Sequence, residues 1–404
     1  MWWLNYLAML ILANHPFPTS ASPTPYNSRD VSTSSSSTSS NPLTQFALQK
    51  VLQDGSPIFG PYTKTNSNTS TWMKAYPDST KIVHMNLPGT HDTQTWNYSL
   101  ATQEALSGIT ALGGQPVLPP SVFRCQEEPI IAMLDAGIRV FDLRFAFDVL
   151  NSSLVFWHSQ ALQSETATVE DVLFGFYRWL EDHPSEAVLM SLNYEGSTTK
   201  YARNNAAVQM AIFDVLTTKA AKRYFVQKKN EFGTLGEARG KITLLRRFGL
   251  DALPASYSEA IQGVYFPAGQ WRDNSADIAL VYNAAENLTA YIEDFYEPAT
   301  PLGSGAALGI EMKYNATTAH LNKAASNEGD SLFWTFASAE FNAGIPTVSP
   351  RIMATGNGTE STPLGGVNQR LVPFLEGMRG KRVGIVMFDF FGTPGGLVKT
   401  LLSL

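Results

Sequence analysis

Short apolar segments alternate with amphipathic helical patterns along most of this chain from Lys81 onward. The apolar segments are rich in β-branched and aromatic residues and predict strands. Several are apolar on both faces, which is typical of parallel strands covered by helices. The predicted strands are residues 82–87, 137–145, 154–158, 187–193, 241–248, 277–282, 331–338 and 382–390.

The clearest helical pattern covers residues 168–183, where apolar positions recur every three or four residues and His183 and Pro184 end the stripe. Strands that alternate with such helices predict an α/β fold. Eight strands favour a (β/α)₈ TIM-type barrel, whether regular, distorted or incomplete. A doubly wound open sheet remains the alternative, because periodicity alone does not separate the two.

The N-terminal part has a different composition. Residues 1–22 contain an apolar stretch too short to span a bilayer, followed by small residues and prolines, and predict a secretory signal peptide. A buried N-terminal helix is the alternative, because no Lys or Arg precedes the apolar stretch. Residues 23–71 predict a Ser/Thr/Pro-rich disordered stalk. Order is then expected from Trp72, with residues 72–404 forming a catalytic barrel.

Composition excludes some functions. A net charge of -6 argues against binding nucleic acid, which requires a basic surface. Contact with lipid must then depend on local apolar groups or a small basic pocket. The single cysteine allows no intrachain disulfide. Together with the signal peptide, six N-x-S/T sequons predict a secreted glycoprotein, which we expect to be a monomer; they begin at Asn68, Asn97, Asn151, Asn287, Asn315 and Asn357.

Polar side chains follow the predicted strands at their carboxyl ends, the face that carries the active site of a barrel. Core strands do not usually end in this way. These residues are His91 and Asp92, Asp142 and Arg144, His158, Asn193 and Glu195, Arg246 and Arg247, and Asp389. Asp142 and Arg144 are two positions apart and therefore share a face.

These residue types suit the cleavage of a phosphodiester. Two histidines can act as general base and general acid, because imidazole titrates near neutral pH. An arginine can hold a phosphate and stabilise its developing charge. An aspartate can orient one imidazole. The set requires no metal and no cofactor.

Several segments resemble the bacterial-type phosphatidylinositol-specific phospholipases C, which belong to the PLC-like phosphodiesterases with an X domain. The similarity runs from about Trp72 to the C-terminus with the same order and spacing. The combination of PGTHD, a D-L-R strand and an H-P-S-E helix end is specific. The segments are WMKAYPDS, NLPGTHDT, AGIRVFDLRF, HPSEAVLMSL, ARGKITLLRRF and IVMFDFF.

The resemblance implies a role for each matching residue. It makes His91 the base that deprotonates the inositol 2-hydroxyl and His158 the acid that protonates the leaving diacylglycerol oxygen. It makes Arg144 the phosphate clamp, Asp92 the partner of the acid and Asp389 the residue that orients His91. The implied substrate is a phosphoinositide lipid at a membrane surface, and the implied product is inositol 1,2-cyclic phosphate. The implied substrate-binding residues are Asp142, Arg247, Asp294 and Tyr296.

Two positions depart from the family pattern. Ser159 follows His158 where the family often has glycine, and Asn193 stands where bacterial members carry a lysine. The loss of that cation bears on headgroup affinity rather than on the phosphate chemistry.

Two other functions remain open. Metal-dependent glycerophosphodiester hydrolases also use barrels with histidines, but they need two carboxylates around the metal. Here Arg144 occupies the place of the second carboxylate. The non-enzymatic alternative is a secreted barrel that binds lipid or glycan without turnover.

The pairing of Asp389 with His91 gives two structural expectations. First, the first and last strands must be neighbours, although these residues are far apart in the sequence. Second, the carboxylate is expected to raise the pKa of His91 and to fix its tautomer.

Overall fold

The computed structural model describes residues 41–114, 116–195, 203–301, 303–341 and 347–404. The chain divides into two units, Met1–Gln45 and Phe46–Leu404, and the fold below is that of the second. The predicted signal peptide and residues 23–40 of the predicted stalk lie outside the described residues. Within the described part, the helices are all too short or too polar to cross a membrane.

The core of the second unit is one barrel-like sheet. Neighbouring strands run parallel except β8 and β9, which are antiparallel. In sheet order the strands are β7 (Val264–Tyr265), β6 (Ile242–Arg247), β5 (Val188–Tyr194), β2 (Val140–Phe147), β1 (Leu87–Thr90), β11 (Ile385–Phe388), β10 (Leu332–Phe336), β9 (Leu288–Asp294) and β8 (Ser275–Asn283).

The barrel is nearly but not fully closed. Among the described residues, no ladder joins β7 to β8, the two ends of the sheet order. Aromatic side chains bridge this opening, because the rings of Phe266 and Tyr282 lie 6.2 Å apart. The predicted TIM-type barrel is therefore confirmed in its incomplete form.

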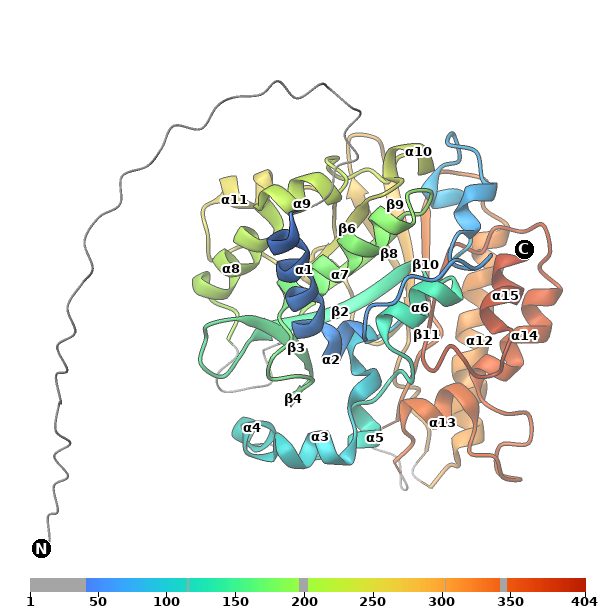
Figure 1. The fold of residues 1–404 in the computed structure, drawn as a ribbon. Coiled ribbons are helices and arrows are strands. Elements are labelled where there is room, and N and C mark those ends of the chain that lie inside the picture. The colour runs from blue at the N-terminus through green and yellow to red at the C-terminus, as the bar shows by residue number, and fades with distance from the viewer. Residues whose placement is uncertain (1–40, 115, 196–202, 302, 342–346) are drawn as a thin grey trace, which may run out of the picture. The chain divides into compact units, whose positions relative to one another are not determined.

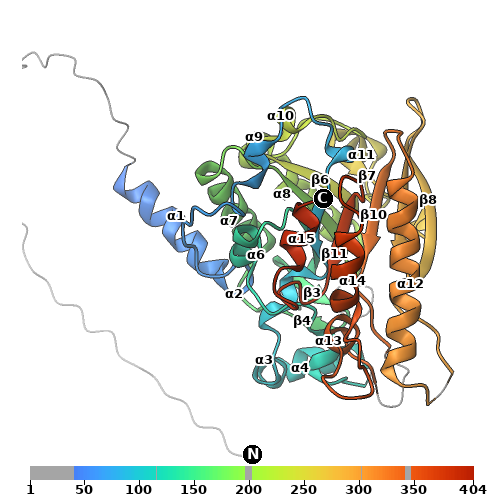
Figure 2. The same ribbon diagram turned by 90° about the vertical axis from the view of Figure 1, so that its right-hand side faces the viewer.

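Helices cover the outside of the sheet, and Figures 1 and 2 show α12, α14 and α15 side by side next to β10 and β11. The longer helices are α6 (Ile130–Ala136), α7 (Val169–Asp182), α8 (Ala206–Thr217), α12 (Ala306–Ala325) and α14 (Val367–Glu376). The shorter ones are α2 (Ser56–Phe59), α3 (Leu100–Ala105), α4 (Ser107–Thr110), α5 (Pro120–Phe123), α9 (Lys219–Tyr224), α10 (Leu235–Ala238), α11 (Ala255–Ala260), α13 (Pro350–Thr355) and α15 (Leu397–Leu402). Helix α1 (Pro42–Asp54) crosses the boundary between the two units. The helix predicted at 168–183 is α7, whose N-terminus is closed by a capping box between Thr168 and Asp171.

Side chains along each strand point alternately into and out of the barrel, and the inward ones place apolar groups at one end and polar groups at the other. On β2, Val140 belongs to the buried apolar cluster inside the barrel. Because side chains alternate, Asp142 and Arg144 project to the same side at successively higher levels. In register, Arg144 pairs with Asn193 on β5, and Asn193 pairs with Arg247 on β6. The interior is thus apolar at one end and charged at the carboxyl ends of the strands.

Two of the predicted strands are placed differently in the structure. The strand predicted at 82–87 lies later, because residues Ile82–His84 form a 3₁₀ turn and β1 is Leu87–Thr90. Pro and Gly inside β1 weaken the strand signal there. The third predicted strand, β3 (Leu154–His158), is not a barrel strand; it pairs antiparallel with β2 and with β4 (Ala161–Leu162). Strands β4, β7 and β9 were not predicted.

The prediction that order begins near Trp72 is wrong. Ile58 and Phe59 of α2 are fully buried and belong to the main core. The ring of Phe59 lies 5.3 Å from that of Phe176, and a Cβ on Gly175 would approach the Phe59 ring to 2.6 Å. The segment before Trp72 therefore contributes apolar surface to the core, which its Ser/Thr-rich composition had hidden.

Candidate active site

A cavity of about 320 Å³ opens at the carboxyl ends of the strands. Of the strand-end and substrate-binding residues expected at the site, Asp142, which lies behind the arginines, and Arg246 do not line it. The cavity is lined by His91, Asp92, Cys125, Arg144, His158, Ser159, Asn193, Glu195, Arg247, Trp271, Asp273, Asp294, Tyr296, Ala339, Glu340, Pro350 and Asp389.

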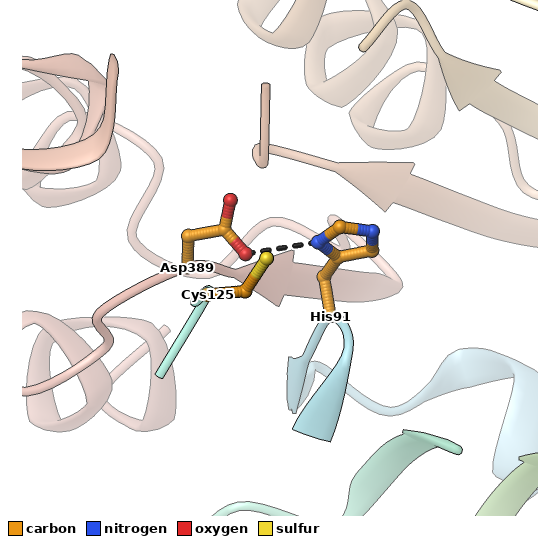
Figure 3. A group of neighbouring side chains, drawn as sticks. All are labelled: His91, Cys125 and Asp389. Carbon is orange, nitrogen blue, oxygen red and sulfur yellow. Dashed lines mark hydrogen bonds and ion pairs between the residues drawn. The ribbon is translucent and has the colours of Figure 1, made fainter. Parts of the chain in front are cut away.

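His91 and Asp389 face each other across the pair of strands β1 and β11 (Figure 3). His91 Nδ1 and Asp389 Oδ1 are 2.9 Å apart. The strands can approach this closely because Gly89 has no side chain; a Cβ there would lie 2.4 Å from Met387 Sδ. The two strands pair directly, which confirms the expectation that the first and last strands are neighbours.

Buried amide side chains fix the backbone on both sides of this pair. Gln126 Nε2 donates to the carbonyls of His91 and Phe388, each at 2.8 Å. Asn368 Nδ2 on α14 donates to the carbonyl of Asp389 at 2.8 Å. The geometry of the His91–Asp389 pair is therefore held from β1, β11 and α14 together.

The hydrogen bonds of His91 define its tautomer. Arg144 Nη2 lies 2.9 Å from His91 Nε2 and can only donate, so Nε2 accepts. The ring proton then lies on Nδ1 and is donated to Asp389. Burial and the Arg144 guanidinium lower the pKa of His91 well below its usual value, so the imidazole is neutral at neutral pH. The expected net rise of the His91 pKa is therefore wrong, whereas the fixed tautomer agrees with the geometry.

Asp389 is almost completely buried, with 1% of its side chain exposed. Burial raises the pKa of its carboxyl well above the usual range, and the nearby carboxyls Asp92 and Glu340 add to that rise. Its Oδ2 has no hydrogen-bond partner. The proton between Asp389 and His91 is consequently held between two groups that both disfavour charge.

His158, at the end of β3, lines the same cavity. Its Nδ1 lies 2.9 Å from the Phe123 carbonyl, which can only accept, so Nδ1 carries a proton. Its Nε2 lies 3.2 Å from Asp92 Oδ2. Asp92 Oδ2 is also 3.2 Å from His91 Nε2, so this buried carboxylate lies between the two imidazoles. A protonated His158 in this position can donate a proton into the cavity.

Arg144 connects the two histidines through Asp92. Its Nε lies 2.6 Å from Asp92 Oδ1, and its Nη1 is 3.4 Å from Glu195 Oε1. Burial raises the pKa of Asp92 to about 6, against the opposing effects of Arg144 and His158. The guanidinium is thus held in place by carboxylates and still lines the cavity.

Asp142 lies beneath the arginines. It is fully buried, and its Oδ1 accepts from Ser191 Oγ at 2.9 Å and from Arg247 Nη1 at 3.4 Å. Its Oδ2 is 3.5 Å from Arg144 Nε. Asp142 thus positions both cationic side chains rather than forming part of the cavity wall.

The other side of the cavity is built around Trp271. The Arg247 guanidinium carbon lies 3.9 Å from the centre of the Trp271 ring, and Trp271 Nε1 donates to Asp294 Oδ2 at 2.7 Å. Tyr296 donates to Asp273 Oδ1 at 3.0 Å. This group of stacked and hydrogen-bonding side chains is suited to a polar ring such as a sugar or cyclitol.

Sequence reasoning missed several of the cavity residues, among them Trp271 and Glu340. Trp271 lies in the connection between β7 and β8, a loop with no motif to identify it. Glu340 follows β10 and is largely buried, which raises its pKa to about 7. Only its position after a predicted strand, the signal that found Asp389, could have identified Glu340.

The residue after each reacting side chain has a left-handed backbone. Asp92, Ser159 and Phe390 have φ of 40°, 51° and 45°. This region favours glycine, which accounts for the glycine that the family often has at the place of Ser159. Such conformations are uncommon for other residues and cluster at functional sites. The Ser159 amide donates to Glu195 Oε1 at 2.9 Å, which supports the turn.

Metal-ligand atoms also converge here. Among the described residues, three groups place such atoms within 4.8 Å of one another. The groups are His91, Cys125 and Asp389; Asp92, Cys125 and His158; and His91, Asp92 and Asp142. Each draws on one of the two histidines, so a metal in any of them would compete with acid–base chemistry.

Comparisons with known proteins were made by sequence and by structure. Residues 121–248 match the family described as phosphatidylinositol-specific phospholipase C, X domain. A 1-phosphatidylinositol phosphodiesterase of Listeria monocytogenes is 28% identical over 187 residues, covering 45% of this chain and 50% of that protein. A mouse PI-PLC X domain-containing protein 1 is 35% identical over 127 residues, covering 28% of this chain and 36% of that protein. The chain thus spans about half of the first of these relatives and less of the second.

The fold extends further than the sequence similarity. A double mutant of the phosphatidylinositol-specific phospholipase C from S. aureus superposes with a TM-score of 0.60 at 18% identity, covering 83% of this chain and 96% of that one. The Listeria monocytogenes enzyme superposes with a TM-score of 0.57 at 21% identity, covering 83% and 97%. The resemblance inferred from the sequence is therefore confirmed: part of the chain is similar in sequence to phosphatidylinositol-specific phospholipases C, and the chain shares the fold of the bacterial ones.

Proposed function

We propose that this chain cleaves phosphatidylinositol, or a glycosylated form of it, to diacylglycerol and inositol 1,2-cyclic phosphate without a metal. The observation that carries the proposal is the position of Arg144. Its guanidinium lines the cavity, donates to His91 Nε2 and is joined to His158 through Asp92, so a phosphate bound to it would have both a base and an acid nearby. The relatives named as phosphodiesterases support the same substrate class.

The reaction begins at His91. Its unprotonated Nε2 accepts the proton of the inositol 2-hydroxyl, and the 2-oxygen attacks phosphorus. Arg144 Nη2, which donates to Nε2 in this structure, then donates to a phosphate oxygen instead. The positive charge that forms on His91 is stabilised by Asp389 through Nδ1–H.

His158 completes the reaction. As the bond between phosphorus and the diacylglycerol oxygen breaks, Nε2–H of His158 protonates that oxygen. Asp92 Oδ2 lies 3.2 Å from the same nitrogen and can orient this N–H. The products are an alcohol and a five-membered cyclic phosphate, and a proton has moved from His158 to the alcohol and from the hydroxyl to His91.

Apolar side chains support contact with a lipid surface. The segment between β1 and β2 exposes Leu100 (59%) and Val117 (44%). It also reaches the site, because Phe123 in the same segment accepts the hydrogen bond from His158. We expect Leu100→Ser with Val117→Ser to weaken binding to neutral vesicles but to preserve turnover of a short-chain soluble substrate. An equal loss on both substrates would contradict this assignment.

We also propose that the chain is exported. The predicted signal peptide and the sequons support this. Mass spectrometry of the protein recovered from the medium of the expressing cell should show a chain lacking roughly the first 13 to 22 residues and carrying N-linked glycans. Retention of the intact, unmodified chain inside the cell would contradict it.

A phosphorus NMR time course with phosphatidylinositol vesicles tests the reaction. After dialysis against a chelator, we expect the phosphodiester signal to be replaced by that of a five-membered cyclic phosphate. A rate that is lost on chelation and returns with calcium would instead favour a metal-dependent glycerophosphodiester hydrolase. Absence of any turnover would favour the lipid- or glycan-binding alternative.

A further inference from the structure

The chain's single cysteine lies beside the bond between His91 and Asp389 (Figure 3). Cys125 follows α5, and its backbone is tied to the site: its N–H donates to Thr95 Oγ1 at 2.9 Å, and its carbonyl accepts from Phe390 N at 2.9 Å. The side chain is fully buried and borders the cavity. The thiol is therefore fixed in position and reached only through the cavity.

We propose that Cys125 Sγ, His91 Nδ1 and Asp389 form a binding site for Zn²⁺ that switches off the base. Thiolate, imidazole and carboxylate are the ligands that zinc prefers, at about 2.0–2.3 Å from the metal. In this structure one ligand atom from each residue lies within 4.8 Å of the others. Zinc would replace the proton between Nδ1 and Oδ1, and a water molecule in the cavity would supply the fourth ligand.

The surroundings of His91 are suited to the replacement of its Nδ1 proton by zinc. A zinc ion on Nδ1 requires the ring proton to move to Nε2. Asp92 Oδ2 lies 3.2 Å from Nε2 and is buried. A metal-ligating histidine almost always donates its other N–H to such a group, often a carboxylate. Asp92 can accept this N–H while it retains Arg144 Nε through Oδ1, and Arg144 Nη2, which donates to Nε2 in this structure, must then turn away from it.

Zinc binds a thiolate, so the metal must displace the proton of the Cys125 thiol. Zinc binding forms the Zn–S bond and releases that proton to solvent. Asp389 Oδ2 also lacks a partner, so this carboxyl has a free acceptor to turn toward a cation.

Inhibition follows from the change of tautomer and rests on the proposed function. With the proton on Nε2, His91 can no longer accept the proton of the substrate hydroxyl. Zinc would therefore block the first step while leaving His158 and Arg247 unchanged. The binding itself does not depend on any catalytic activity.

Cobalt provides a direct test, because a thiolate bound to Co²⁺ absorbs in the near ultraviolet. We expect the full chain to bind one Co²⁺ with this band, and Zn²⁺ to displace it. Since Cys125 is the single cysteine, the band can have no other source in the chain. Cys125→Ser should remove the band, and Asp92→Asn should weaken binding by about tenfold to a hundredfold.

The two histidines serve as each other's controls. His91→Ala should abolish the cobalt band, and His158→Ala should preserve it, with circular dichroism showing that both variants are folded. No band at saturating Co²⁺, or a band that depends on His158 instead, would overturn the proposal.

Zn²⁺ should lower the rate of phosphatidylinositol cleavage, and the concentration for half-inhibition should rise at least tenfold in Cys125→Ser. Zinc binding without inhibition would overturn the proposal that the metal switches off the base. If the wild-type chain has no turnover at all, the proposed function fails, and the cobalt spectrum still decides the metal site.

Discussion

The two sides of the cavity are built in different ways. On one side, His91, Asp389 and Arg144 extend from β1, β11 and β2, three strands that are consecutive in the sheet. On the other, Arg247 and Asp294 come from β6 and β9, each one strand in from the opening of the barrel, and the loop residue Trp271 connects them. Backbone pairing between strands therefore fixes the reacting side chains. Side-chain contacts across an unpaired gap fix Arg247, Trp271 and Asp294.

This difference predicts different kinetic consequences. Groups held by the sheet meet the phosphate as its charge develops, so their loss should lower kcat. Groups around Trp271 contact the part of the substrate that does not react, so their loss should mainly raise KM. The variants below test this separation.

The largest effects are expected at the two histidines. His91→Ala and His158→Ala should each lower kcat by about two to four orders of magnitude. An ester with a good leaving group separates the two roles, because its cleavage needs less help from an acid. On it, the His158 variant should recover part of its rate and the His91 variant should not. Identical behaviour of both variants on both substrates would refute the assigned roles.

The next largest loss of kcat is expected at Arg144. Arg144→Met should lower kcat by about two to three orders of magnitude, because a charge-stabilising donor is lost. Arg144→Lys retains the charge but loses the planar pair of donors, so only a small part of the rate should return. Thermal unfolding of both variants must accompany the kinetics, because Asp92 loses a buried partner at 2.6 Å. A full recovery with lysine would show that position and charge suffice and that the paired donors are not needed.

Asp389→Asn should lower kcat less than the loss of either histidine, because His91 remains as the base and Arg144 also fixes its tautomer. The base must be unprotonated, so the rate falls as the pH drops through the pKa of His91, which is already below its usual value. An amide cannot carry the negative charge that stabilises a protonated His91, so the substitution can only lower that pKa further. The acidic limb of the pH profile should therefore move to lower pH.

A second His–Asp pair provides the matched control. Asp330 Oδ1 lies 2.8 Å from His84 Nε2 on the surface, away from the cavity. Asp330→Asn should change neither the rate nor the acidic limb of the pH profile. If Asp389→Asn has a near wild-type rate and the acidic limb of its pH profile does not move, Asp389 has only a structural role.

The same difference explains what the sequence could and could not predict. His91, Arg144 and Asp389 were predictable because each stands at the end of an apolar strand, and adjacent strands bring strand ends together. The alternation on β2 also placed Asp142 and Arg144 on one face. The roles assigned to them came from the family resemblance.

Other features depend on tertiary structure. Trp271 could not be predicted because its loop has no pattern of its own, and its position depends on where the barrel fails to close. The antiparallel pairing of β3 was equally hidden, since a buried hairpin strand is as apolar as a barrel strand. The pKa of His91 moved opposite to expectation because burial and Arg144 outweigh one carboxylate.

The smallest effect is expected from Asn193→Lys, which lies on the boundary between the two sides. Asn193 is in register with Arg144 on β2 and with Arg247 on β6, so the three side chains form one row facing the interior. A lysine there would add a third cation between two arginines, and Glu195, on the same face two residues later, would offset part of the repulsion. We expect KM for phosphatidylinositol to fall by less than tenfold, because one partly solvated charge contributes about 1 kcal/mol or less, and kcat to stay within about twofold. Asn193→Met, similar in length but uncharged, is the matched control and should not lower KM. A large change in kcat would mean that this position acts on the phosphate, and the division of the cavity into a reacting side and a headgroup side would then be wrong.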